Sequence, residues 1–166
     1  WFAAFVPATF VIINYISYKK DLIKVKERDV QDGLGTVYYA ISLLILVIVS
    51  FVVYKEPSLG LIPNLVMAYG DGLAGLLGRR IKSKRYKLSD TKKSVAGSIT
   101  MFVISTLLIG GYLLYWHKEI FWSTPHWPLV AVLIGFAITA IEAISEKGTD
   151  NITVPLGTLC MLLLIG

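Results

Sequence analysis

The sequence is poor in charged side chains and has almost no cysteine. Only 16% of its 166 residues are charged, whereas a soluble domain usually has about 25%. Cys160 is the only cysteine, which excludes an internal disulfide and a cysteine-based metal site. Because it lies in an apolar run, we expect it to be a small buried hydrophobe. The chain is 55% hydrophobic with a mean hydropathy of +0.68, which predicts a membrane protein.

Several signatures of soluble enzymes are also absent. The chain has no Gly-x4-Gly-Lys-Ser/Thr loop, no Gly-x-Ser-x-Gly elbow and no His-x-x-x-His pair, so P-loop kinases, hydrolases with that elbow and zinc proteases are excluded. The two histidines, His117 and His126, lie among aromatic residues. We interpret both as residues of the membrane interface.

Long apolar runs dominate the sequence instead. They cover residues 1–18, 36–54, 59–78, 94–117 and 127–141, and a sixth begins near 152. A spanning helix needs roughly 20 mostly apolar residues, and the first run lacks the basic start and cleavage site of a signal peptide. We therefore predict an all-α, polytopic transmembrane helix bundle of about six spans, forming one catalytic domain over residues 1–166. The missing initiator methionine and the apolar end suggest further helices beyond either end.

Basic residues are distributed unevenly among the connecting loops. Loops 18–35, 79–93 and 145–151 hold 14 of the 16 lysines and arginines, and six alternating spans place these loops on one side. The positive-inside rule makes that side cytoplasmic, and the tryptophans 116, 122 and 127 form an interfacial belt on the other. Topology and anionic membrane lipids account for this charge, and no basic module of an RNA-binding kind occurs, so we expect no nucleic-acid partner.

Asp71 is a carboxylate within an otherwise apolar run. It begins a face of small residues at helical spacing, made of Asp71, Ala74, Gly75 and Gly78. A carboxylate within a span is costly and marks a functional site by default, and Arg79 and Arg80 follow at the cytoplasmic end. The alternative is helix packing, which small residues favour, with Asp71 capping a helix or pairing with a loop arginine.

A second polar element opens the fourth run. Lys92 and Lys93 precede a face with small and hydroxyl side chains, made of Ser94, Gly97 and Ser98. Thr91 or Ser94 is placed to cap the helix, and a helix N-terminus with free N–H groups beside lysines is a natural phosphate site. A solvated loop explains the lysines but not the small face, so we favour the phosphate site.

The third element joins the last two runs. Glu142 lies about one turn inside the end of its span, where a carboxylate needs a partner or a metal. Asp150 and Asn151 stand where the next span begins, and helix capping is the alternative role for either. Topology alone puts all three elements on the cytoplasmic side. Asp71, Glu142 and Asp150 offer the oxygen ligands that Mg²⁺ prefers.

Acids and cations gathered at one membrane face favour phosphoryl or nucleotidyl transfer, in which positioning and charge neutralisation supply most of the catalysis. Arginine and lysine side chains bind phosphate groups well. The candidate phosphate-binding residues are Arg79, Arg80, Lys92, Lys93, Ser94, Gly97, Ser98 and Asn151. The candidate catalytic residues are Asp71, Lys93 and Glu142.

The three elements in this order resemble the family of dolichol kinase, phytol kinase and CTP-dependent diacylglycerol kinase. The motifs are residues 70–80, 93–98, and Glu142 with 148–155, and residues 33–39 match more weakly. The resemblance implies a membrane enzyme that transfers the γ-phosphate of CTP to a lipid hydroxyl with Mg²⁺. Asp71 would then be a metal ligand or the base near the hydroxyl. Glu142 and Asp150 would complete the metal and nucleotide site, with Asn151 as a hydrogen-bonding partner.

Two alternatives stay open at this point. The region also resembles phosphatidate cytidylyltransferases, but the Gly-His-Gly-Gly segment that those enzymes carry is absent. A non-enzymatic transporter or subunit is the other alternative, for which inverted repeats would be the signal, and the two halves show no convincing repeat. The residues do not distinguish diacylglycerol, phytol, geranylgeraniol and polyprenol as the acceptor alcohol.

Overall fold

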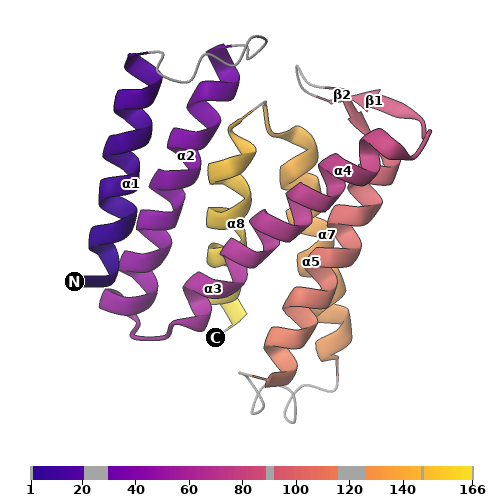
Figure 1. Cartoon of the computed structure of the whole chain (residues 1–166). Coiled ribbons are helices and arrows are strands. Elements are labelled where there is room, and N and C mark those ends of the chain that lie inside the picture. The colour runs from indigo at the N-terminus through magenta and orange to yellow at the C-terminus, as the bar shows by residue number, and fades with distance from the viewer. Residues whose placement is uncertain (1, 21–29, 89–91, 116–125, 147, 166) are drawn as a thin grey trace.

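The computed structural model describes residues 2–20, 30–88, 92–115, 126–146 and 148–165 as helices and a small hairpin (Figure 1). The elements are α1 (Phe2–Lys19), α2 (Val30–Val47), η1 (Ile48–Val53), α3 (Ser58–Leu65), η2 (Val66–Asp71), α4 (Gly72–Arg80), β1 (Arg85–Lys87), β2 (Lys92–Ser94), α5 (Val95–Tyr115), α7 (Trp127–Ile144) and α8 (Asp150–Ile165). The predicted residues Trp116, His117 and Trp122 lie outside the described ranges.

The predicted bundle is confirmed, and its spans follow the apolar runs closely. Five helices are long and apolar enough to cross a membrane, at Phe2–Lys19, Leu34–Val53, Ser58–Arg80, Val95–Tyr115 and Trp127–Ile144. The sixth predicted span, α8, is apolar but has only 16 residues. Five helices rather than six therefore meet the length of a span within the described part of the chain.

The core lies where α5 packs against α7 and α8 packs against α2, α3 and α7. On α5 the buried side chains of Met101, Ser105, Ile109 and Tyr112 recur every three or four residues, so one helical face is turned inward. Cys160 on α8 is exposed, so its expected burial is wrong. The apolar run around it faces outward as well as inward, as is usual in a membrane bundle.

Gly135 is a point of close approach between α5 and α7. A Cβ atom there would lie 3.1 Å from the backbone nitrogen of Thr106 on α5. We expect Gly135→Ala to lower the stability of the detergent-solubilised protein by about 1–3 kcal/mol, because the helices must separate to admit the methyl group. Gly111→Ala is the matched control, since a Cβ there meets nothing within 4 Å. Equal thermal unfolding midpoints for both variants would contradict this account of the packing.

Two helices contain π-helical turns, which the sequence pattern did not predict. One occupies Ile48–Val53 and the other Val66–Asp71, so that α3, η2 and α4 form one continuous but irregular helix. Turns of this kind occur frequently at functional sites. Asp71 is the last residue of the second turn, which therefore sets the side of α4 on which its carboxylate lies.

A two-stranded hairpin stands where the sequence predicted only a loop. β1 and β2 are antiparallel, with Tyr86 opposite Lys93, and they lie at the same end of the bundle as the connection between α7 and α8 (Figure 1). The hydroxyl groups of Tyr86 and Ser98 are hydrogen-bonded to each other. This bond ties the hairpin to the first turn of α5.

Candidate functional site

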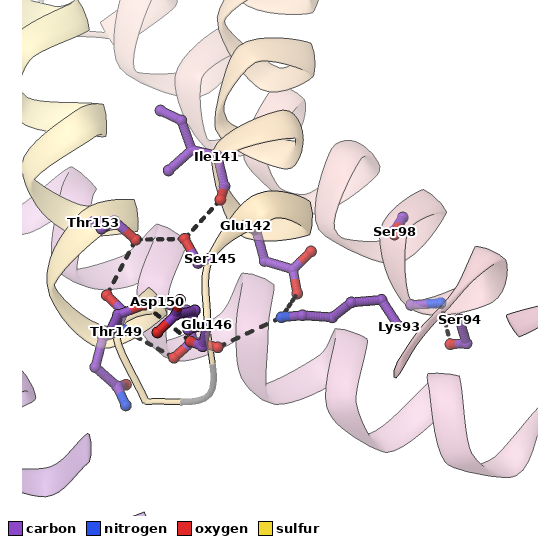
Figure 2. Close-up of polar contacts among 12 residues, drawn as sticks. Lys93, Ser94, Ser98, Ile141, Glu142, Ser145, Glu146, Thr149, Asp150 and Thr153 are labelled. Atoms are coloured by element: carbon purple, nitrogen blue, oxygen red, sulfur yellow. Dashed lines mark hydrogen bonds and ion pairs between the residues drawn. The ribbon is translucent and has the colours of Figure 1, made fainter. Parts of the chain in front are cut away.

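Lys93 lies between two carboxylates that come from different helices (Figure 2). Its Nζ atom is 2.5 Å from Oε1 of Glu142, near the end of α7, and 3.6 Å from Oδ2 of Asp150, the first residue of α8. Glu142 is only 5% exposed. The partner that a buried carboxylate requires is therefore Lys93, which the sequence placed on the same side of the membrane but not in contact.

The charge of Lys93 is stabilised by its neighbours. Burial of the ammonium group opposes its charged form. The hydrogen bond to Glu142 and the charges of Glu142, Asp150 and Asp71 outweigh that effect, and the pKa of Lys93 is raised above its ordinary value. The side chain is therefore a fixed cation at neutral pH, suited to holding an anion but not to accepting a proton.

A cavity of about 340 Å³ opens beside this ion pair, and we call it the first cavity. Its lining residues are Asp71, Ala74, Gly75, Gly78, Arg79, Arg85, Lys92, Lys93, Ser94, Gly97, Ser98 and Glu142. All but Arg85 were singled out in the sequence. The cavity thus joins the three predicted elements, with four cationic side chains and two carboxylates around one space.

Some small residues of α4 allow close helix packing, and another leaves space for the first cavity. A Cβ atom on Gly97 of α5 would lie 3.1 Å from the carbonyl oxygen of Ala74, and one on Gly78 would lie 3.4 Å from the Cα atom of Gly97. Ala74 and Gly78 therefore allow α4 and α5 to pack closely. A Cβ atom on Gly75 would meet nothing within 4 Å. Gly75 instead leaves the first cavity open.

The backbone amides at the N-terminus of α5 were expected to be free to bind phosphate, and this expectation is wrong for Val95, Ala96 and Gly97. The amide of Val95 donates to the carbonyl of Lys84 at 3.0 Å, and that of Ala96 donates to the hydroxyl of Ser83 at 3.1 Å. The amide of Gly97 donates to Ser94 Oγ at 3.1 Å, which confirms Ser94 as a cap. The predicted Thr91 cap lies outside the described residues. An anion in the first cavity would meet side-chain cations and the helix dipole rather than these three amides.

A second cavity, of about 540 Å³, is also lined by Asp71. Its lining residues are Phe10, Asn14, Gly35, Thr36, Tyr39, Asp71, Arg79, Gly148, Asp150 and Asn151. Of the residues that the structure describes, only Asp71 and Arg79 line both cavities.

Close approach of α2 to the α7–α8 connection forms part of the second cavity. A Cβ atom on Gly35 would lie 3.1 Å from the side-chain nitrogen of Asn151 and 3.4 Å from the Cα atom of Gly148. Gly148 adopts φ 85°, a conformation that glycine tolerates and other residues rarely adopt. The glycines of the predicted third element and of the weaker motif at residues 33–39 thus meet at one point.

Most predicted site residues line one of the two cavities, but Arg80 lines neither. It is exposed at the end of α4. Two polar cavity residues were not predicted from the sequence. Arg85 was interpreted only as a loop charge, and Asn14 was not singled out, although an amide within an apolar run is a signal of helix contact or function.

Among the described residues no group of three or more His, Cys, Asp or Glu side chains is arranged to hold a metal. Asp71, Glu142 and Asp150 therefore do not form a protein-only metal cage.

Comparison with known proteins finds that the chain is similar to several phytol kinases. The chain is 34% identical to the phytol kinase of Synechocystis sp. over 95% of its own length and 66% of that protein's. It is 35% identical to a probable phytol kinase of Glycine max over 97% of the chain and 56% of the relative. The phytol kinase 1 of Arabidopsis thaliana is 29% identical over 96% of the chain and 55% of the relative.

The chain thus spans less than two thirds of the length of the curated relatives it matches. No protein-family model matches it, and no solved structure does.

Proposed function

Because the chain belongs to the family of lipid kinases that includes the phytol kinases, we propose that it phosphorylates the hydroxyl group of an isoprenoid alcohol of the phytol type. We propose CTP as the phosphate donor, in keeping with the family that the motifs resemble. The observation that carries the proposal is the first cavity, because it unites a polyanion-binding set of cations with Asp71. Diacylglycerol is the alternative acceptor.

The chemistry needs an acceptor oxygen, a phosphate and a route for one proton. The lipid oxygen would form a bond to the γ-phosphorus, and the bond from that phosphorus to the β–γ bridging oxygen would break. The bond electrons would leave with the nucleoside diphosphate. Asp71 would accept the proton of the lipid hydroxyl, while Lys93, Lys92 and Arg79 would hold phosphate oxygens. Positioning and charge neutralisation of this kind supply most of the rate in phosphoryl transfer.

A divalent cation fits this site as a partner of the nucleotide. Mg²⁺ is commonly held by one or two carboxylates, with substrate phosphates and water completing its shell. Asp71, which lines both cavities, carries the oxygens that Mg²⁺ prefers and would hold the ion beside the nucleotide in the first cavity, with Asp150 of the second cavity as a neighbouring carboxylate. The ion would supply charge neutralisation on the transferred phosphate. Glu142 would act on this arrangement through Lys93, which it holds in place.

The orientation of the site follows from charge. The hairpin and the end of α4 carry exposed basic residues at the end of the bundle where the cavity lies. The positive-inside rule would place this end in the cytoplasm, or in the compartment equivalent to it. Nucleotide would then reach the site from the aqueous side and the alcohol from the bilayer.

An assay with γ-³²P-labelled CTP, Mg²⁺ and a panel of lipid alcohols tests the proposal directly. We expect label in a lipid monophosphate, separated by thin-layer chromatography, and CDP as the second product. Appearance of the cytidine moiety in lipid, with release of labelled pyrophosphate when a lipid phosphate is supplied, would identify a cytidylyltransferase instead. Parallel reactions with ATP test the choice of nucleotide.

Gly75 offers a way to block the first cavity without disturbing the fold. We expect Gly75→Leu to lower turnover by about 100-fold or more, because misplacement of a bound group by about 1 Å already costs that much. The unfolding midpoint should fall little, since the space beside Gly75 is open. Gly72→Leu on the same helix is the matched control: Gly72 is equally free of neighbours but lines neither cavity. Equal activities of the two variants would argue against the first cavity as the nucleotide site.

A further inference from the structure

We infer that the two cavities divide the two substrates between them: the first holds the triphosphate, and the second holds the hydroxyl end of the lipid alcohol. The inference rests on the proposed kinase function and adds to it a separate binding site for the acceptor. Asp71 and Arg79, which line both cavities, would then lie where the two substrates meet.

The balance of charge differs between the two cavities, with an excess of cations in the first but not among the described residues of the second. Around the first cavity the cations Arg79, Arg85, Lys92 and Lys93 outnumber the two carboxylates. Among the described residues that line the second, Arg79 is the only cation, against the carboxylates of Asp71 and Asp150. A triphosphate carries several negative charges and is favoured where cations exceed acids, whereas a neutral hydroxyl needs only hydrogen-bonding partners.

The second cavity is bounded by α1, the candidate span with the smallest buried share. Within α1 only Pro7 is buried, and large apolar side chains such as Phe5 and Ile13 are 63% and 62% exposed. Phe10 and Asn14, one turn apart on α1, line the cavity. A hydrocarbon tail that passes Phe10 would leave the cavity directly into the bilayer. The Asn14 amide donates to the Phe10 carbonyl at 2.8 Å and retains an oxygen that can accept a bond from a lipid hydroxyl.

The wall shared by the cavities lies along one helix face. Asp71, which directly precedes α4, and Gly75 and Arg79 within it are spaced by four residues, so they lie on one side of the helix over roughly 12 Å, and of the three only Asp71 and Arg79 line both cavities. Asp71 is at the end nearer the membrane interior, and Arg79 is near the aqueous end. The hydroxyl of a lipid in the second cavity could therefore approach a phosphate in the first across Asp71, with the lipid tail remaining on the membrane side.

Two substitutions with opposite expected effects test the division in the purified protein. We expect Asn14→Leu to raise the KM for phytol by about tenfold with less than twofold change for CTP, because the loss is confined to binding of one substrate. We expect Arg85→Ala to raise the KM for CTP by about tenfold with less than twofold change in the KM for phytol. Thr9→Val on α1, which removes a similar side-chain bond to the helix backbone, and Lys87→Ala on β1 are the matched controls. Neither residue lines a cavity.

A rise in the KM for CTP with Asn14→Leu, or in the KM for phytol with Arg85→Ala, would overturn the division while leaving the kinase function intact. Unchanged constants in both variants would overturn it as well. If Asn14→Leu does not fold, Phe10→Ala takes its place with the same expected result. Absence of lipid phosphate from the unaltered protein with every alcohol would instead overturn the proposed function, and the division with it.

Discussion

Asp71→Asn is expected to reduce lipid phosphorylation by about 10³-fold or more, because asparagine keeps the volume and polarity of the side chain but cannot accept a proton or bind Mg²⁺ well. Asp71 lines both cavities and ends the π-helical turn that orients it. No other carboxylate in the described residues lines both. The measurement is the initial rate of the γ-³²P-CTP assay with the protein in detergent.

The asparagine variant should remain folded, with an unfolding midpoint near that of the unaltered protein. The control is Glu146→Gln, which removes one negative charge at the same end of the bundle. Glu146 is exposed and lines neither cavity, so that variant should retain full activity. If Asp71→Asn keeps its nucleotide turnover, Asp71 is neither the base nor a metal ligand.

Lys93→Met is expected to have the second largest effect, on both stability and activity. It removes the cation that pairs with the buried Glu142 at 2.5 Å and with Asp150 at 3.6 Å. Breaking one side of a buried ion pair typically costs about 3–5 kcal/mol, because the remaining charge is left without compensation. The first cavity would also lose a phosphate-binding cation. We expect a lower unfolding midpoint in detergent and a rate near background.

The double variant Lys93→Met/Glu142→Gln separates these two effects. It removes both charges, so most of the lost stability should return, as is usual when a buried pair is replaced as a unit. Turnover should not return, because the cation is still missing from the first cavity. Recovery of activity together with stability would show that Lys93 has only a structural role, in holding α7 and the hairpin together.

The sequence was sufficient to predict the membrane class, the approximate limits of the spans and most of the residues that line the first cavity. Apolar runs, the bias of lysine and arginine among loops, and the cost of an acid within a span are local properties of the chain. They identified Asp71, Lys93 and Glu142 as members of one side of the membrane before any contact was known. The same properties predicted α8 as a sixth span, but this helix, although apolar, is too short to meet the length of a span.

The tertiary structure decided which of these residues meet and what each contact is for. Lys93 pairs with Glu142 across 49 positions of sequence, and no local pattern specifies such a contact. Ser83 and Lys84, just before β1, and Ser94 accept hydrogen bonds from the amides at the start of α5 that had been expected to bind phosphate. Small residues likewise look alike in sequence, yet Gly78 packs against α5 while Gly75 faces open space. Whether a glycine packs against another helix or lines a cavity depends on how close the neighbouring helix lies. That distance is set by the packing of the whole bundle.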